Sequence, residues 1–427
     1  MSFRVCRLQL VSFIVASTCC LSVSAQSSPS ATSSTALTPA ALATSTLYSL
    51  EFIAPEDRWA IRVELRQNSY HERYDANGDK QALGSELNKV NLNSAIFPDL
   101  AVFGTAATLG ETHFNADVES KRVELTLGYG LTKNLTVGII VPYGKVTTHA
   151  SFSVSGGNVG FNPAFDATQA PGATNPPLLP VGLGPTTPVG TAGVQQILTN
   201  PAFGLAYQAL GTTRWKGIGD PTIGLLWRFY KTQKDSLILG TGIRIGLADD
   251  VDPDNLLQVP IDDGSTDYRA RLEYYRDLNA GFDLKLATEY TYQFEDSVTR
   301  RVPASGVLLA PAASKESLRR QLGDYWEYDI GLGKVLGDWR VAATWHRYVK
   351  SGDTYTSSIG TNTSALQANT ALYANQWRAS LSWSGIRSWQ QGDLPLPLIV
   401  QLELQETYAA KNFPDVRDIY LQVTSFF

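Results

Sequence analysis

Two short patterns in this chain place residue types that could do chemistry at meaningful spacings. In the first, Asp75-Ala76-Asn77-Gly78-Asp79 and Glu86 put oxygen ligands at positions one, three, five and twelve of a loop. That order is typical of a calcium-binding loop. Lys80, however, stands at position six, where such a loop needs glycine, and its ammonium group would repel the ion. A simple Asn77-Gly78 turn after a strand explains the same residues, so calcium binding stays open.

In the second pattern, His149 and Ser151 stand two residues apart, which places both side chains on one face of a strand. The pair resembles the catalytic His and Ser of outer-membrane phospholipases, and it therefore suggests a lipid hydrolase as an alternative function. Ser151 is followed by Phe152-Ser153, whereas the phospholipase pattern has Asn-Gly there. The end of a strand entering a long loop explains the pair equally well. We therefore expect no enzymatic activity, no catalytic residue, no metal site and no cofactor.

A third and larger group consists of charged residues at alternate positions of predicted strands, opposite apolar residues. If these strands form a barrel, the charges face its lumen. They could then line a pathway that selects solutes, or they could pair with one another and fill a closed lumen. The sequence does not decide between these two arrangements. The residues are Arg62, Glu64, Arg66, Glu124, Arg228, Arg244, Arg269, Arg271, Glu273, Lys285, Glu289, Glu327, Asp329, Arg340, Arg378 and Glu403.

The elements that carry these residues alternate between apolar and polar side chains with a period of two. The pattern begins at Trp59 and recurs to the end of the chain, as in 135–143, 326–332 and 396–404. Segments of about ten residues with one apolar face predict a transmembrane antiparallel β-barrel. A soluble β-sandwich also alternates, but its strands are usually about five or six residues long. Aromatic residues make up 10% of the chain, consistent with interfacial girdles.

The connections between these strands alternate between short and long, which is typical of outer-membrane barrels. Short turns are expected near residues 132–134, 231–235, 277–280 and 337–338, and long outer loops at 150–217, 249–266, 296–323 and 351–371. Counting from Trp59 predicts 12 strands. A hairpin hidden between Leu92 and Leu109 would raise the count to 14. The apolar, proline-rich segment 161–209 is expected to fold into the barrel mouth, although a cap on the rim would also fit.

The sequences at both ends of the chain predict that the protein is located in the bacterial envelope. Arg4 and Arg7 precede the apolar run 8–16, and Val23-Ser24-Ala25 forms a cleavage site, so residues 1–25 are expected to be a signal peptide. The segment after Ala16 fits a lipoprotein site poorly. Residues 26–57 are expected to be a flexible periplasmic segment and 58–427 the barrel. The last strand ends at Phe427, which resembles the signal read by the barrel assembly machinery.

Composition excludes several other classes of protein. Removing residues 1–25 takes away all three cysteines and changes the formal net charge from −5 to −7, so disulfides and thiol chemistry are not expected. No cluster of basic residues suggests nucleic acid. No segment after the signal peptide approaches 18 consecutive apolar residues, which excludes a helical membrane protein.

Three motifs resemble those of the outer-membrane transporter family of the meta-pathway of phenol degradation. They are Tyr129-Gly130-Leu131-Thr132, Val141-Pro142-Tyr143 and Gly217-Ile218-Gly219-Asp220. The resemblance extends loosely over the barrel and is best in residues 121–247. It implies a barrel for passive uptake of small hydrophobic or aromatic solutes. We expect a monomer in outer-membrane lipid, with a closed structural barrel as a further alternative.

Overall fold

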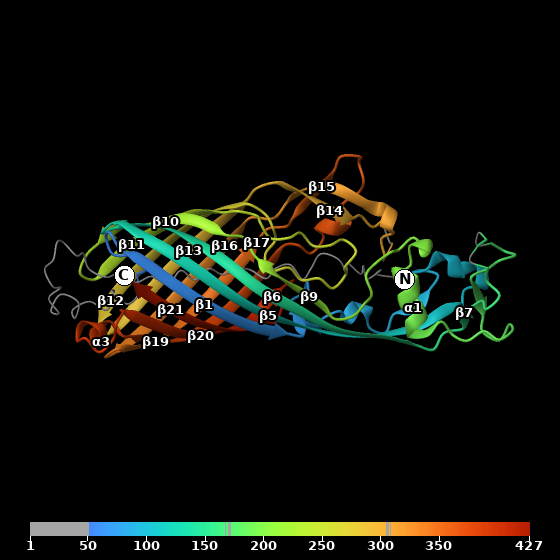
Figure 1. The fold of residues 1–427 in the computed structure, drawn as a ribbon, viewed down its shortest axis with the longest axis horizontal. Helices are drawn as coiled ribbons and strands as arrows, with labels where there is room; N and C mark the ends of the chain where they lie inside the picture. The colour runs from blue at the N-terminus through green and yellow to red at the C-terminus, as the bar shows by residue number, and fades with distance from the viewer. Residues whose placement is uncertain (1–50, 167, 170–171, 305–306, 308) are drawn as a thin grey trace.

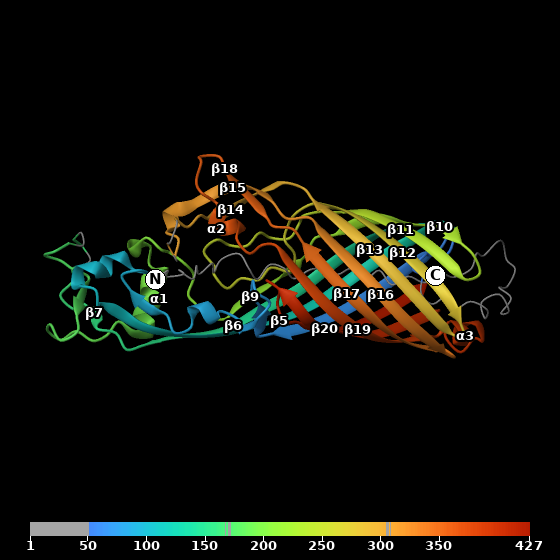
Figure 2. The ribbon, with the colours of Figure 1, turned by 180° about the vertical axis from the view of Figure 1, so that it is seen from behind.

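The computed structural model describes residues 51–427, apart from 167, 170–171, 305–306 and 308. The expected signal peptide 1–25 lies outside the described residues. Twelve long strands coil around a common axis and close into an antiparallel barrel (Figures 1 and 2). They are β1 (Trp59–Tyr70), β5 (Thr108–Thr132), β6 (Leu135–Ser155), β10 (Thr222–Lys231), β11 (Asp235–Arg244), β12 (Asp267–Asn279), β13 (Phe282–Gln293), β16 (Tyr325–Leu336), β17 (Trp339–Lys350), β19 (Leu372–Ser384), β20 (Leu398–Lys411) and β21 (Arg417–Phe426).

The barrel closes where β1 pairs with the last strand, β21, on one side and with β5 on the other. Beyond the last paired residues, the backbone N–H of Phe427 donates to Trp59 O at 3.0 Å, and that of Trp59 donates to Phe427 O at 2.9 Å. Closure leaves no open edge in the ring of strands. The predicted count of 12 is confirmed. The alternative of 14 is wrong, because Leu92–Leu109 holds only β4 (Asn91–Asn93) and a 3₁₀ helix before β5 begins.

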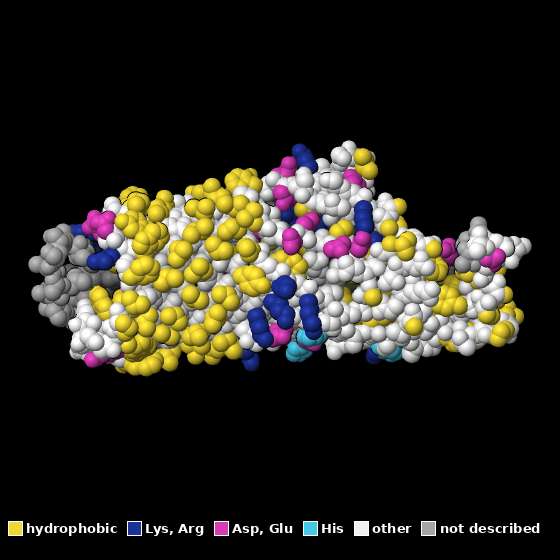
Figure 3. Space-filling view, viewed as in Figure 1, with side chains coloured by type: hydrophobic (Ala, Val, Ile, Leu, Met, Phe, Trp, Pro, Cys, Tyr) yellow, Lys and Arg dark blue, Asp and Glu magenta, His cyan; other side chains and the backbone are white. Residues whose placement is uncertain are grey.

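The outward faces of the strands form a continuous apolar belt, seen as the yellow area in Figure 3. Large apolar side chains there are widely exposed, for example Trp227 at 48%, Ile330 at 52% and Trp339 at 48%. Exposure of this extent would be unfavourable in water and suits contact with lipid. Within the described residues, no helix combines the length and apolar character needed to cross a bilayer.

The remaining elements lie mostly at the end of the barrel that carries the long loops. Strands β5 and β6 continue past the barrel as a long ribbon, which carries α1 and β7 at its far end (Figure 1). The small elements near this ribbon are β2 (Glu72–Tyr74), β3 (Lys80–Ala82), η3 (Ser85–Leu87), η4 (Pro98–Phe103), β7 (Val159–Phe161), β8 (Leu178–Pro180), α1 (Gly190–Thr199), η5 (Pro201–Phe203) and β9 (Thr213–Ile218). A separate sheet is formed by β14 (Asp296–Arg301), β15 (Lys315–Gln321) and β18 (Thr354–Ser357), near η6 (Ala312–Ser314) and α2 (Ser364–Gln367). Helix α3 (Ile386–Gln390) lies at the opposite end.

The barrel mouth is occupied by a different loop from the one expected. Segment 161–209 contributes mainly to the distal ribbon, where α1 packs on β6. The connection between β11 and β12 instead turns inward, and its side chains Leu256, Leu257, Val259 and Ile261 are buried in the hydrophobic core at the base of the ribbon. A segment with four apolar side chains in six residues gains by this burial.

Candidate functional site

The sixteen charged residues predicted to face the lumen all lie on barrel strands, with their side chains buried or partly buried. All of them except Glu64 form ion pairs, which lie at several levels along the barrel. Arg228 and Arg340 lie near the short-turn end, where Arg340 pairs with Asp283 at 2.7 Å. Arg66 pairs with Asp418 at 2.7 Å nearer the loops, and Arg244 pairs with Asp263 at 3.2 Å at the loop end. The other residues lie between these levels.

The densest pairing is centred on Arg271 of β12 in the middle of the barrel. Its guanidinium contacts Glu273 at 2.7 Å, Asp329 at 2.7 Å and Glu289 at 3.3 Å. Asp329 in turn lies 2.8 Å from His346 Nδ1 and 3.5 Å from Arg378. The network extends to the remaining members through Arg269 with Glu289 and Glu327, Lys285 with Glu273, and Arg378 with Glu403. On the opposite side of the closure, Arg62 approaches Glu124 at 3.8 Å and Gln422 donates to Glu64 at 2.7 Å.

This network fills the lumen along the wall from β12 to β20. The side chains of Arg271, Asp329 and His346 are only 8%, 3% and 1% exposed. Side chains lining a water-filled channel would be far more accessible. Along this wall, the structure therefore favours paired charges that fill the lumen over an open polar channel.

The wall formed by β5, β6, β10 and β11 has the opposite character. Gly128 is paired in register with Gly138, Gly138 with Gly224, and Gly224 with Gly242, so that four glycines form one row across four strands. A Cβ at Gly224 would lie 2.5 Å from Thr241 O, and one at Gly138 would lie 2.6 Å from Leu127 O. Glycine has no side chain, so these four positions leave space inside the barrel next to the backbone of the four strands. We call these four residues the glycine row.

A cavity of about 110 Å³ adjoins the glycine row. Its lining is mostly apolar, with Phe52, Ile140 and Leu226 beside the threonines 126, 136 and 222. The charged wall contributes Arg269, Arg271, Glu273 and Glu289. Arg269 is 5% exposed, and among the described residues its Nε and Nη1 have no hydrogen-bond partner. An apolar cavity with a few convergent polar groups is the usual form of a small-molecule site.

The short-turn end of this cavity is covered by residues 51–55, which enter the lumen. Glu51 pairs with Arg228 at 2.7 Å and with Lys231. Phe52 lies against the guanidinium of Arg62, 4.9 Å from the ring centroid, and Ile53 packs between side chains of β11 and β12. These five residues are buried, so they do not fit the flexible segment predicted over 26–57. Their apolar and paired side chains gain more in the lumen than in water.

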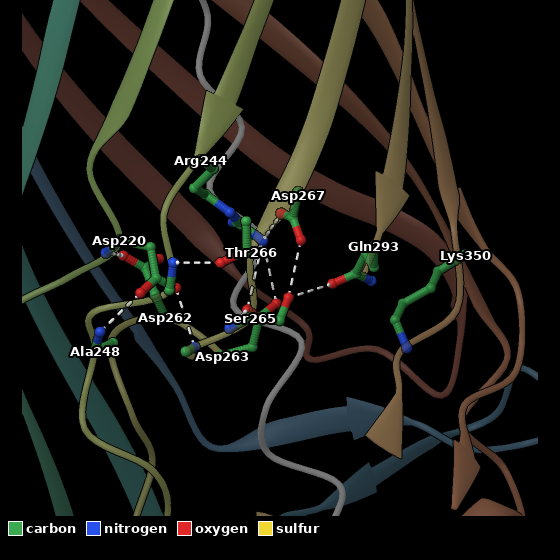
Figure 4. A network of polar contacts seen from close by, with 12 residues as sticks. Asp220, Arg244, Ala248, Asp262, Asp263, Ser265, Thr266, Asp267, Gln293 and Lys350 are labelled. Atoms are coloured by element: carbon green, nitrogen blue, oxygen red, sulfur yellow. Dashed lines mark hydrogen bonds and ion pairs between the residues drawn. The ribbon is translucent and has the colours of Figure 1, made fainter. Parts of the chain in front are cut away.

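The loop end is closed by a polar network that fixes the β11–β12 connection (Figure 4). Asp220, between β9 and β10, accepts hydrogen bonds from the backbone N–H groups of Leu247 at 2.8 Å, Ala248 at 2.7 Å and Gly264 at 3.0 Å. Its own N–H donates to Asp262 at 2.8 Å. Burial, followed by the neighbouring carboxylates of Asp262 and Asp263, raises the pKa of Asp220 to about 6.

The calcium pattern does not form a cation site in the structure. Asp75 accepts from the backbone N–H groups of Asn77 and Asp79 within its own turn. Glu86 instead pairs with Arg73 at 3.7 Å, and Lys80 pairs with Asp415 at 2.6 Å. In the described part of the chain, no group of three or more His, Cys, Asp or Glu side chains is placed to hold a metal ion.

The hydrolase pattern is also not assembled. His149 and Ser151 do lie on the same face of β6, and both are exposed on the outside of the ribbon. Among the described residues, no hydrogen bond joins them. A catalytic His and Ser need that contact for the base to take the proton of the nucleophile.

Three features of the site were not predicted from the sequence. His346 was not among the predicted lumen residues, although its alternation with Trp345 in the sequence indicates the lumen face. The burial of residues 51–55 had a signal in the apolar residues Phe52, Ile53 and Ala54, which differ from the Ser/Thr/Ala-rich stretch before them. The glycine row had only a partial signal, because glycines at alternate positions become neighbours only once the register of four strands is known.

Comparison with models of protein families identifies the family of the chain. Residues 103–388 match the model of a family described as "Putative MetA-pathway of phenol degradation". No curated protein matches the chain. Among solved structures, the chain is similar to an outer membrane channel from Pseudomonas putida F1, with 12% identity, a TM-score of 0.49, and coverage of 87% of this chain and 96% of that one. It is also similar to the toluene transporter TbuX of Ralstonia pickettii, with 10% identity, a TM-score of 0.34, and coverage of 87% and 89%. Similarities this distant leave the function to be argued from the chain's own residues.

Proposed function

The chain belongs to the MetA-pathway family of phenol degradation, and we propose that it is an outer-membrane β-barrel for passive uptake of small hydrophobic or aromatic solutes. The apolar belt supports insertion in a bilayer. We further propose that residues 1–25 direct export as a signal peptide. The chain then inserts as a monomer through the barrel assembly machinery, which reads the strand ending at Phe427.

The observation that carries this proposal is the cavity beside the glycine row. Its volume of about 110 Å³ is on the scale of engineered apolar cavities of about 150 Å³ that bind benzene. A single aromatic ring could lie against the bare backbone of the row, where side chains would otherwise exclude it. Nε and Nη1 of Arg269 could donate hydrogen bonds to a hydroxyl or carboxylate on that ring. Of the sixteen charged residues, we propose that Arg269, Arg271, Glu273 and Glu289 contact the solute and that the others shape the lumen.

A closed structural barrel is the second candidate, because segments of the chain lie at both ends of the lumen. Residues 51–55 lie at one end and the β11–β12 connection at the other. In the transport proposal, at least one of these segments moves when solute passes. Loop and terminus movements of this kind are common in gated proteins.

Uptake measurements on a cavity-filling variant would test the proposal. Thr222 faces the cavity, and Thr222→Phe would fill it; Thr344→Phe on β17 puts the same side chain at a lumen position outside it. Cells lacking the chromosomal copy would be complemented with each variant, and initial uptake of radiolabelled phenol and benzoate measured. The ring at position 222 would take up the space that we propose for the solute, so we expect uptake roughly ten-fold lower, equivalent to about 1.4 kcal/mol of lost binding. Thr344→Phe overpacks the lumen outside the cavity at a comparable cost in stability of roughly 1–3 kcal/mol, and it should change uptake little.

The outcomes separate the function from the site. Equal uptake by the deletion strain and the complemented strain would contradict transport and favour the closed barrel. Normal uptake through Thr222→Phe would retain transport but reject this cavity. Heat-modifiable migration on a gel would establish that each variant has folded as a barrel.

A further inference from the structure

Three lysines stand side by side on the outer surface of the ribbon. Lys121 of β5 is paired in register with Lys145 of β6, and Lys145 with Lys216 of β9. All three are exposed and lie on the outward face of their strands. Arg214 is exposed two residues before Lys216 on the same face. We call Lys121, Lys145 and Lys216 the lysine row.

The adjacent outward position on each of these strands is apolar. Val123, Tyr143 and Ile218 form the next row in the same register and are 41%, 50% and 55% exposed. The lysine row therefore begins one side-chain pair beyond the edge of the apolar belt, on the side of the long loops. Figure 3 shows a group of dark blue Lys and Arg side chains at the edge of the yellow belt, in the region where Figure 1 labels β5, β6 and β9.

Like charges directly opposite one another in neighbouring strands destabilise a sheet. One carboxylate lies close enough to offset part of this repulsion, since Glu119 pairs with Lys121 at 2.8 Å. In the described part of the chain, no carboxylate lies within ion-pair distance of Lys145 or Lys216. The arrangement has an electrostatic cost that an external anion at this level would remove.

We propose that the lysine row binds the phosphate groups of an anionic glycolipid in the outer leaflet of the membrane. This inference rests on the proposed insertion in the outer membrane, with the long loops outside. The acyl chains of such a lipid would lie along Val123, Tyr143 and Ile218. Its head group would then reach the level of the three ammonium groups, each of which can donate three hydrogen bonds to phosphate oxygens.

Native mass spectrometry of the refolded mature chain with bisphosphorylated lipid A would measure this binding. The test variant is Lys121→Gln/Lys145→Gln/Lys216→Gln. The matched control, Arg58→Gln/Lys133→Gln/Lys234→Gln, removes the same charge from exposed positions at the short-turn end. A lysine near an anionic surface contributes about a five-fold gain in affinity, so the test variant should bind lipid A roughly 100-fold more weakly and the control should bind almost normally.

In a second measurement, Lys145→Gln should change the urea midpoint of unfolding in opposite directions without and with lipid A. In zwitterionic micelles without lipid A, Lys145→Gln removes repulsion and should raise the urea midpoint of unfolding. With lipid A present, the same change should lower the midpoint relative to the wild type. This comparison remains informative if the triple variant does not fold.

Several outcomes would overturn the proposal. Lipid A could bind the test variant as tightly as the wild type, or the control variant could lose as much affinity. Inorganic phosphate at the same phosphate concentration could stabilise the protein as well as lipid A does, which would point to a free anion. None of these outcomes depends on solute uptake, so a failure here is distinguishable from a failure of the transport proposal.

Discussion

Glu51 and Arg228, which are 177 residues apart in the chain, form an ion pair of 2.7 Å at the short-turn end of the lumen. Arg228 also donates to Lys133 O and to Asn134 Oδ1, so one guanidinium joins the entering segment to the β5–β6 turn. The exposed fraction of the Glu51 side chain is 0%. This pair therefore holds residues 51–55 against the cavity that we propose for the solute.

Glu51→Ala should loosen that segment and destabilise the barrel. The change removes the carboxylate that pairs with both Arg228 and Lys231, and the loss of one member of a buried ion pair costs about 3 kcal/mol. We expect a lower urea midpoint and a larger single-channel conductance in planar bilayers. Glu56→Ala, directly after this segment and only half-buried, serves as the control. Unchanged conductance with Glu51→Ala would show that residues 51–55 do not restrict passage.

The pH dependence of stability should contain a contribution from Asp220. Its pKa is about 6 in the folded protein and about 4 in the unfolded chain. A raised carboxyl pKa contributes stability below the unfolded value, and this contribution is lost as the pH rises through about 6. Between pH 5 and pH 8 the wild type should lose about 1 kcal/mol from this group.

Urea unfolding of Asp220→Asn at both pH values would measure that contribution, because the variant lacks the titrating group. Asp249→Asn, exposed in the same connection, is the control and should keep the wild-type dependence. If Asp220→Asn showed the same slope as the wild type, the titration would belong to other carboxyls.

The glycine row should tolerate no side chain at its centre. In Gly224→Ala the new Cβ would lie 2.5 Å from the backbone oxygen of Thr241, which cannot move without distorting β11. We expect a loss of about 1–3 kcal/mol in the free energy of unfolding. Gly211→Ala is the matched control, because nothing lies within 4 Å of a Cβ built there. Equal urea midpoints for the two variants would argue against close strand contact at the row.

Ser151→Ala should leave the protein unchanged in every assay of lipid hydrolysis. The hydroxyl lies on an exposed strand face without a hydrogen bond to His149 among the described residues. The measurement is fatty-acid release from phospholipid micelles by the purified wild type and the variant. If the wild type released fatty acids and Ser151→Ala did not, the result would support the hydrolase alternative.

The barrel, and which side chains face the lipid or the lumen, could be predicted from the sequence. The alternation of apolar and polar residues is visible within each strand and needs no knowledge of distant contacts. Trp59–Leu65 and the strand ending at Phe427 each carry their own pattern, and closure requires only that they meet. The site could be predicted less well. Asp220 meets Gly264 through a loop that folds inward, and Gly138 meets Gly224 through register across a long connection. Both depend on contacts between distant segments, which one sequence does not reveal.

The pairing of β1 with β21 has a consequence for how the protein folds. Its partners, such as Ala60 and Phe426, come from opposite ends of the described chain, so the contact carries a large loop-closure entropy and contributes a high contact order. Until it forms, β1 and β21 each remain an exposed edge that could pair with another chain. We therefore expect slow folding, with this single seam as the step most sensitive to aggregation.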